Sequence, residues 1–135
     1  FSYVCLDQQY SRVNTPQSVL ELAQSCNRGN LQDHELKLRL HRALFAQQMW
    51  DKRCDTLSGG ERMRLCLCSL MIANHVPDLF VLDEPTNNLD LSSLAILTRT
   101  VRNYRGTLLV VSHDDNFTRE IGITRTVVLE SPSAG

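Results

Sequence analysis

The stretch that decides the fold is residues 78–86, which read Asp-Leu-Phe-Val-Leu-Asp-Glu-Pro-Thr. Its four apolar residues run without polar interruption and stop at two adjacent carboxylates, Asp83 and Glu84. Such a run predicts a strand covered on both faces, as in a parallel α/β sheet. Because ligands of parallel sheets bind beyond the carboxyl ends of the strands, this pair is a candidate for handling a phosphate, a metal ion or an attacking water. Taken alone, the pattern fits a strand with an acidic turn equally well.

The composition is that of a globular protein, with 42% hydrophobic and 21% charged residues in 135. A net charge of -1 gives no sign of a general nucleic-acid-binding surface. No apolar run is long enough to span a bilayer, and no signal-peptide pattern opens the sequence. The chain begins at Phe1, in strand-like sequence, and we expect it to be part of something longer.

The five cysteines are an odd number without CxxC spacing. Cys66 and Cys68 lie in an apolar helical pattern, which favours buried reduced thiols over disulfides or a zinc site. The cysteines therefore indicate a reducing, cytoplasmic setting.

Upstream of the central strand, the sequence predicts a short strand at residues 1–6, with Gln8 just beyond its carboxyl end. Thr15 and Pro16 predict the N-cap and first residue of a helix that runs to Cys26. A second helix is predicted over residues 33–46. Its apolar stripe would consist of Leu36, Leu40, Ala43 and Leu44. A polar loop over residues 47–55, anchored by Met49 and Trp50, would follow.

The segment Leu57-Ser58-Gly59-Gly60-Glu61 supports two interpretations. Ser58 and Glu61 form a capping-box pattern before an apolar helix at residues 63–73. Two consecutive glycines, however, cost helix stability and gain nothing for packing. They allow a ligand to approach backbone amides at a helix N-terminus, which favours a phosphate-contacting helix start. Arg62 and Arg64 are interpreted as solvated surface charges.

Downstream, residues 91–104 predict an amphipathic helix with Asp90 as N-cap. Residues 107–112 predict a second buried strand, which ends at His113. A histidine directly beyond a parallel strand, beside a strand that ends in Asp-Glu, is a functional candidate. Asp114 would cap a short helix over residues 116–121, and a last strand is expected at residues 126–130.

Four motifs in this order resemble the nucleotide-binding domain of an ATP-binding cassette (ABC) protein. They are Gln8 after a strand, Leu57 to Glu61, Leu82 to Thr86, and Val111 to Asp114. The resemblance covers nearly the whole chain. It implies that Gln8 is the Q-loop glutamine and that Ser58, Gly59, Gly60 and Glu61 belong to the signature motif.

The same resemblance implies roles for the later residues. Asp83 would support magnesium, Glu84 would be the general base that polarises the attacking water, and His113 would contact the γ-phosphate. Asn88 to Asp90 would form the D-loop at an interface between two cassettes. ATP and Mg²⁺ are thus the implied ligands, with Gln8 and Asp83 in the magnesium shell. Ser58, Gly59 and Gly60 would contact ATP held by the opposing cassette.

One departure limits the resemblance. The chain contains no Gly-x-x-x-x-Gly-Lys-Ser/Thr, so the phosphate loop and its lysine are missing from these residues. The expected fold is a P-loop NTPase-like α/β parallel sheet without its phosphate-loop strand, carrying an inserted ABC helical subdomain. The strand at residues 107–112 would then have an unpaired edge. We expect the chain by itself to be inactive as an ATPase.

The expected division is a Q-loop strand at residues 1–9, a helical subdomain at 10–56, the remaining ATPase core at 57–130 and a tail at 131–135. Asn87 and Asn88, the Leu44-Phe45 pair and Gly106-Thr107 make the sequence more similar to the duplicated ABC-F class than to transporters. That class implies a second cassette and the ribosome as partners, and no membrane domains.

Three alternatives stay open at this point. A transporter ATPase subunit would have membrane domains as partners. The carboxyl-terminal head half of an SMC-type chromosome protein also lacks a phosphate loop, although there the Q-loop belongs to the other half. A degenerate cassette acting as an interaction module would not need Glu84 and His113.

Overall fold

The computed structural model describes residues 2–6, 10, 13–29, 31–74, 77–86 and 89–122. The predicted Q-loop residue Gln8, the pair Asn87-Asn88, the strand at residues 126–130 and the tail lie outside the described residues. None of the described helices is long and apolar enough to cross a membrane.

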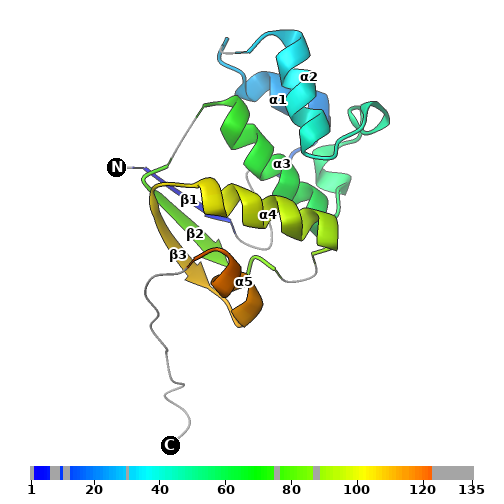
Figure 1. Ribbon diagram of the computed structural model, residues 1–135. Coiled ribbons are helices and arrows are strands. Elements are labelled where there is room, and N and C mark those ends of the chain that lie inside the picture. The colour runs from blue at the N-terminus through cyan, green and yellow to red at the C-terminus, as the bar shows by residue number, and fades with distance from the viewer. Residues whose placement is uncertain are drawn as a thin grey trace, which may run out of the picture.

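Three parallel strands form the sheet in the described part of the chain, in the order β1-β2-β3. They are β1 (Tyr3–Leu6), β2 (Leu79–Asp83) and β3 (Thr107–Val111). The register aligns Leu6 with Leu82 and Asp83 with Val111, so all three carboxyl ends reach the same edge. The predicted parallel α/β sheet is confirmed, and the apolar stretch at residues 79–82 is its central strand (Figure 1).

The prediction that the strands are buried on both faces is wrong for the described residues. Phe80 and Leu82 of β2 are buried, whereas their neighbours Leu79 and Val81 are only half-buried. In β3, Leu109 and Val111 remain 53% and 51% exposed. The reason is that described helices cover one side of the sheet, so alternate residues of each strand lack a covering layer.

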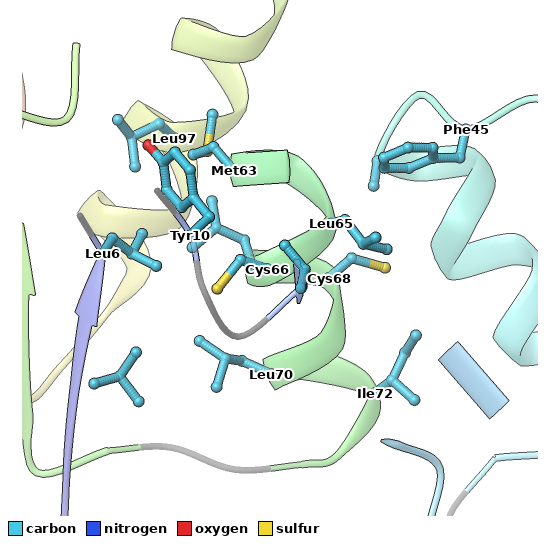
Figure 2. Close-up of a cluster of buried hydrophobic side chains, with 14 of the residues drawn as sticks. Leu6, Tyr10, Phe45, Met63, Leu65, Cys66, Cys68, Leu70, Ile72 and Leu97 are labelled. Carbon is cyan, nitrogen blue, oxygen red and sulfur yellow. The ribbon is translucent and has the colours of Figure 1, made fainter. Parts of the chain in front are cut away.

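Helix α3 (Gly59–Ile72) occupies the centre of the molecule, in contact with α1, α2 and α4. Figure 1 shows α1 and α2 on one side of α3 and α4 on the other. Every residue from Met63 to Leu70 is buried. Figure 2 shows Met63, Cys66 and Leu70 directed towards the Leu6 side, and Leu65, Cys68 and Ile72 directed away from it. Helix α3 therefore joins two halves of one core.

Helix α1 (Val19–Cys26) begins three residues later than predicted. Ser18 is its N-cap, in a capping box with Glu21. The Thr15 hydroxyl instead accepts a hydrogen bond from the Gln17 amide at 3.0 Å. The segment before the helix is also tied to residues 52–55, for example by the Cys54 amide donating to the Gln17 carbonyl at 2.9 Å. The capping box outcompetes the Thr15-Pro16 signal because it satisfies two amides at once.

Helix α2 (Asp33–Arg42) ends earlier than predicted. Leu44 adopts a left-handed conformation (φ 68°) and is 46% exposed, so it leaves the predicted stripe, and Phe45 is buried instead. The predicted loop contains two short 3-10 turns, η2 (Gln47–Met49) and η3 (Cys54–Thr56). The Trp50 indole donates to the Phe45 carbonyl at 2.9 Å, so Trp50 anchors this loop as predicted.

The last two described helices follow the predictions closely. Helix α4 (Leu91–Asn103) has Asp90 at its N-cap position. The apolar residues at three- and four-residue intervals that make this sequence amphipathic are Leu91, Leu94, Leu97 and Val101. Leu97 and Val101 are buried, whereas Leu91 is exposed. Helix α5 (Asp115–Glu120) is capped by Asp114, whose carboxylate accepts from the Phe117 amide at 3.0 Å.

Candidate functional site

The carboxyl end of β2 places Asp83 and Glu84 side by side in the chain but in different environments. Asp83 closes the ladder opposite Val111 and is exposed. Glu84 adopts φ 46°, a left-handed conformation that a side chain with a Cβ rarely takes. Its amide donates to the Val111 carbonyl at 2.7 Å, which holds this turn against β3. Strained backbone of this kind concentrates at functional sites.

The carboxyl end of β3 presents His113 to the solvent. Its two neighbours are fixed, because the Asp114 amide donates to the Ser112 hydroxyl at 3.0 Å and Asp114 caps α5. The His113 side chain is 98% exposed, yet its Nε2 lies 3.4 Å from Oε1 of Glu84. The predicted base and the predicted histidine thus face each other across the ends of two adjacent strands. An exposed imidazole beside a carboxylate can hold or donate a proton at this edge.

The start of α3 is built by a reciprocal cap. The Ser58 amide donates to Glu61 Oε1 at 2.9 Å, and the Glu61 amide donates to the Ser58 hydroxyl at 3.2 Å. Partial burial of Glu61 opposes its ionisation, but the hydrogen bonds from Ser58 outweigh it and hold the pKa of Glu61 below its usual range. The predicted capping box is therefore confirmed, with an ionised Glu61.

The two glycines of this helix start have different surroundings. A Cβ added to Gly59 would meet nothing within 4 Å, and the residue is exposed. A Cβ added to Gly60 would lie 2.9 Å from Ser93 Oγ and 3.0 Å from Asp90 Oδ1. The prediction that neither glycine gains anything for packing is thus wrong for Gly60, which lets α3 approach the start of α4. Only Gly59 leaves its backbone open to a ligand.

Asp90 and Ser93 connect this helix start to the helix that follows the central strand. The Ser93 side chain, through its hydrogen bond, holds the pKa of Asp90 below its usual range. Ser93 itself is fully buried. The start of α3 (Ser58 to Glu61) and Asp90 form one group, and Glu84 and His113 form another. Among the described residues, no hydrogen bond or ion pair joins the two groups. The structure therefore brings the predicted site residues together as two separate groups.

The interpretation of Arg64 as a solvated surface charge is wrong. The side chain is buried. Its Nε donates to Ser93 Oγ at 3.1 Å, and its Nη1 donates to the carbonyls of Ala43 and Leu44 at 2.9 and 3.2 Å. The guanidinium also lies over the Phe45 ring, 5.2 Å from its centroid. Arg64, carried by α3, therefore ties the end of α2 and α4 to that helix.

Arg62 departs from the same interpretation to a smaller degree. It is half-buried, and its Nη2 donates to the Asp55 carbonyl at 2.7 Å. A signal for the burial of Arg64 was present in the sequence: residues 63–70 are otherwise uncharged and mostly apolar, so a helix buried all round leaves no solvated face for this arginine.

The residues at the strand ends fit magnesium chemistry. Mg²⁺ is held in proteins by one or two carboxylates, while substrate phosphates and water supply the other ligands. Asp83 offers an exposed carboxylate at the carboxyl end of the central strand. Gln8, the second predicted ligand, lies outside the described residues.

Comparison with known proteins agrees with the motifs. The family model described as "ABC transporter" matches residues 3–87, well over half of the chain. The energy-dependent translational throttle protein EttA of Haemophilus influenzae is 38% identical over 117 residues, which are 85% of this chain and 20% of that protein. ABC transporter F family member 2 of Arabidopsis thaliana is 41% identical over 87 residues, 64% of this chain and 12% of that protein. The chain thus spans about a fifth or less of the length of these relatives.

Solved structures share the fold. The archaeal ribosome recycling factor aABCE1, in a complex with ribosomal stalk protein aP1, matches with a TM-score of 0.65 and 24% identity, over 89% of this chain and 23% of that one. A dimeric ATP-binding cassette in a post-hydrolysis state, bound to ADP and Pi, matches with a TM-score of 0.63 and 22% identity. The match covers 88% of this chain and 55% of that one.

The order of the motifs, the parallel sheet with its carboxylates and histidine at one edge, and the family match all agree. The chain belongs to the ABC family as part of a nucleotide-binding domain, and its sequence is ABC-F-like.

Proposed function

We propose that the intact protein containing this chain hydrolyses ATP with Mg²⁺ and uses the reaction to control closure of two cassettes. The observation that carries the proposal is the approach of His113 Nε2 to Glu84 Oε1 at 3.4 Å, beyond the carboxyl ends of adjacent parallel strands. Parallel α/β sheets bind their ligands at this edge. The relatives of this sequence are named as ABC-F proteins and as an energy-dependent translational throttle.

In this proposal each residue at the strand ends has one task. Asp83 and Gln8 would hold magnesium, which when bound would neutralise phosphate charge. The Glu84 carboxylate orients the attacking water and accepts its proton as the water oxygen bonds to the γ-phosphorus and the bond to the leaving ADP oxygen breaks. His113 donates a hydrogen bond to the γ-phosphate and offsets its charge. The hydrogen bond from the Glu84 amide to the Val111 carbonyl fixes the backbone that carries this carboxylate, which reduces the reorganisation needed during the reaction.

The start of α3 would serve the opposing cassette. Ser58 is exposed, and Gly59 has open space where a Cβ would stand, so a phosphate could reach the backbone amides of this turn. Gly60 and Glu61 shape the turn, and Asp90 lies beside it. ATP bridging the two surfaces would favour the closed state by binding both.

The ribosome is the partner that we propose for the intact protein, in a cytoplasmic setting. This rests on the names of the relatives, one a translational throttle and one a ribosome recycling factor of the same fold. Within the domain, we propose that residues 1–9 and 57–130 form the ATPase core and residues 10–56 the helical subdomain. The transporter alternative would replace the ribosome by membrane domains.

Glu84→Gln in the intact protein tests the catalytic assignment. The substitution keeps the size of the side chain but removes the proton acceptor, so we expect ATP turnover to fall about 10²-fold or more while ATP binding persists. The matched control is Asp115→Asn, which removes an exposed carboxylate from α5 and should leave turnover unchanged. Turnover of Glu84→Gln within twofold of the unmodified protein would refute the role of Glu84 as the base.

Co-sedimentation tests the partner. If hydrolysis ends the closed state, the Glu84→Gln protein with ATP should stay closed and sediment with ribosomes, and it should do so less with ADP. Sedimentation with membranes and not with ribosomes would support the transporter alternative instead.

A further inference from the structure

A groove of about 940 Å³ opens between α2, α3 and α4, outside the site described above. Its lining includes Asn74 after α3, and Tyr104 and Arg105 after α4. These residues precede β2 and β3, so this end of the groove lies near the amino ends of the strands, opposite Asp83 and His113. The groove is thus separate from the proposed ATP site.

Five arginines give the groove its charge. Arg39 and Arg42 come from α2, Arg64 from α3, Arg99 from α4, and Arg105 from the segment after it. The lining residues that the structure describes include neither aspartate nor glutamate. Among the described residues, no carboxylate forms an ion pair with any of these five arginines. The groove, which we call the arginine groove, is therefore a concave cationic surface on a chain whose net charge is -1.

Two described acids act electrostatically on Arg64 of the lining: Arg64 adds to the hydrogen bonds from Ser58 and Ser93 that lower the pKa of Glu61 and of Asp90. A third described acid, Asp78, raises the pKa of Tyr104 after the larger effect of burial. Asp78 is occupied elsewhere, because its Oδ2 accepts a hydrogen bond from the Ser2 amide at 2.8 Å. In the described part of the chain, none of these three carboxylates forms an ion pair with an arginine of the groove.

The floor of the arginine groove is apolar. Leu67, Leu70 and Met71 of α3 and Ile96 of α4 contribute to it. Met71 is 52% exposed, whereas the residues from Met63 to Leu70 of the same helix are all buried. Exposed methionine in a groove suits an apolar partner of variable shape.

We propose that the arginine groove binds an acidic amphipathic helix of a partner protein. Apolar side chains of such a helix, spaced at i, i+3 and i+4, would lie on the floor. Carboxylates beside them would meet the groove arginines other than Arg64, whose buried guanidinium is already bonded to Ser93 and to two carbonyls. The guanidinium fork suits carboxylates because it can donate two parallel hydrogen bonds.

The lining favours a peptide over RNA. Single-stranded nucleic acid is usually bound by exposed aromatic rings on which bases stack. The aromatic residues in this lining are not available for stacking: Phe80 is buried, and Tyr104 is half-buried with its ring against Phe80 and its hydroxyl bound to the Pro77 carbonyl. An apolar floor also offers nothing to a phosphate backbone.

The test uses the intact protein and a fluorescent synthetic helix of about 18 residues, with leucine at i, i+3, i+4 and i+7 and glutamate elsewhere. The triple substitution Arg42→Glu, Arg99→Glu, Arg105→Glu reverses three exposed charges of the groove. We expect it to raise the Kd of the helix at least about tenfold. The matched control, Arg28→Glu, Arg102→Glu, Arg119→Glu, makes the same change of net charge at exposed arginines outside the lining and should change Kd less than about threefold.

Two further probes separate the sources of binding. A helix with glutamine in place of glutamate should bind at least about tenfold more weakly, and Met71→Ser should weaken the acidic helix several-fold. Circular dichroism and ATP turnover, unchanged in all variants, show that the fold and the ATP site persist. The proposal is overturned if both triple variants weaken binding equally, if the glutamine helix binds as well, or if a single-stranded RNA of about 12 nucleotides binds more tightly and loses affinity through the groove substitutions.

Discussion

Arg64 joins three helices through one side chain. It supplies donors to the carbonyls of Ala43 and Leu44 at the end of α2 and to Ser93 in α4, while α3 carries it. Cation–π contact with Phe45 adds to the packing. A guanidinium can satisfy several acceptors at once in a plane, whereas a lysine ammonium cannot reproduce that geometry.

We predict that Arg64→Met lowers the free energy of unfolding by roughly 2–4 kcal/mol, because the substitution leaves two carbonyls and one hydroxyl without their donor inside the core. Arg64→Lys should recover only part of the loss. Urea denaturation measures both effects. The control is Arg102→Met, an exposed arginine of α4, for which we expect a change within about 0.5 kcal/mol. Equal effects at the two positions would mean that the contacts of Arg64 contribute little.

Residue roles that depend on near neighbours could be predicted from the sequence. Ser58 with Glu61, and Asp114 before α5, were identified as caps because both partners lie within three residues. The contacts of Arg64 could not be predicted in this way, since Ser93 lies 29 positions away and only the tertiary structure brings it close. The contact between His113 and Glu84 could be predicted in part. Parallel strands indicate that both residues lie at the same edge of the sheet, but only the structure gives the distance between them.

At the scale of elements, α3 determines the arrangement, since it contacts α1, α2 and α4. Its start follows a capping box that is visible in the sequence, and its body from Met63 to Leu70 is buried on all sides. The ends of α1 and α2 were harder to predict. A cap at Ser18 replaced the one predicted at Thr15, and a left-handed residue at Leu44 ended α2 early. Where α1 begins and where α2 ends depends on contacts with residues 52–55 and with the core, and the local sequence does not reveal these contacts.

The two glycines at the start of α3 should respond differently to alanine. We predict that Gly60→Ala destabilises the protein by about 1–2 kcal/mol, because the new methyl group would displace Ser93, which is buried and bonded to Arg64. Gly59→Ala should be neutral or stabilising by up to about 1 kcal/mol, since its methyl group meets nothing and alanine favours helix.

For ATP turnover, we expect Gly59→Ala to be harmful although it does not destabilise the protein. If a phosphate approaches this backbone, Gly59→Ala should reduce ATP turnover of the intact protein while its thermal midpoint is kept or raised. Differential scanning calorimetry and a phosphate-release assay on both variants measure the two effects. Unchanged turnover in a stable Gly59→Ala protein would contradict a ligand-contacting role for this glycine.

For the molecule as a whole, buried thiols should make stability depend on alkaline pH. Burial raises the pKa of the Cys68 thiol to about 12, and burial together with the nearby Asp55 raises that of Cys54 to about 11. Because the unfolded thiols ionise near pH 9, the folded state retains these protons longer. The stabilisation is complete below that pH and is lost as the pH rises towards 11–12.

We predict that the free energy of unfolding falls by up to about 1.4 kcal/mol per pH unit per thiol above pH 9. Urea denaturation at pH 8 to 11 measures the slope. The pKa of Tyr104 is also raised by burial, so this residue also lowers the free energy of unfolding as the pH rises. The slope of the unmodified protein is therefore compared with that of the Cys54→Ala, Cys68→Ala variant, which keeps Tyr104. That variant should show a flatter profile; identical slopes would assign the pH dependence to other groups.

The sheet sets a second property of the whole chain. In the described residues β3 pairs with β2 alone, and Leu109 and Val111 stay exposed on one of its faces. The sequence predicted the unpaired edge from the missing phosphate-loop motif, but not the exposed face, because strand periodicity does not say which layers cover a sheet. A strand with an open edge and an apolar face is a template for pairing with a second copy.

We therefore predict that the 135-residue chain by itself associates at micromolar concentration, through β3. Leu109→Lys should shift the population towards monomer, because a charge on this strand must be desolvated when two copies meet. The control is Leu91→Lys, which adds the same charge at the exposed start of α4, where Leu91 is 84% exposed. Size-exclusion chromatography with light scattering distinguishes the species. If both lysine variants dissociate equally, net charge rather than β3 governs association. If the unmodified chain is monomeric at high concentration, β3 is protected by other means.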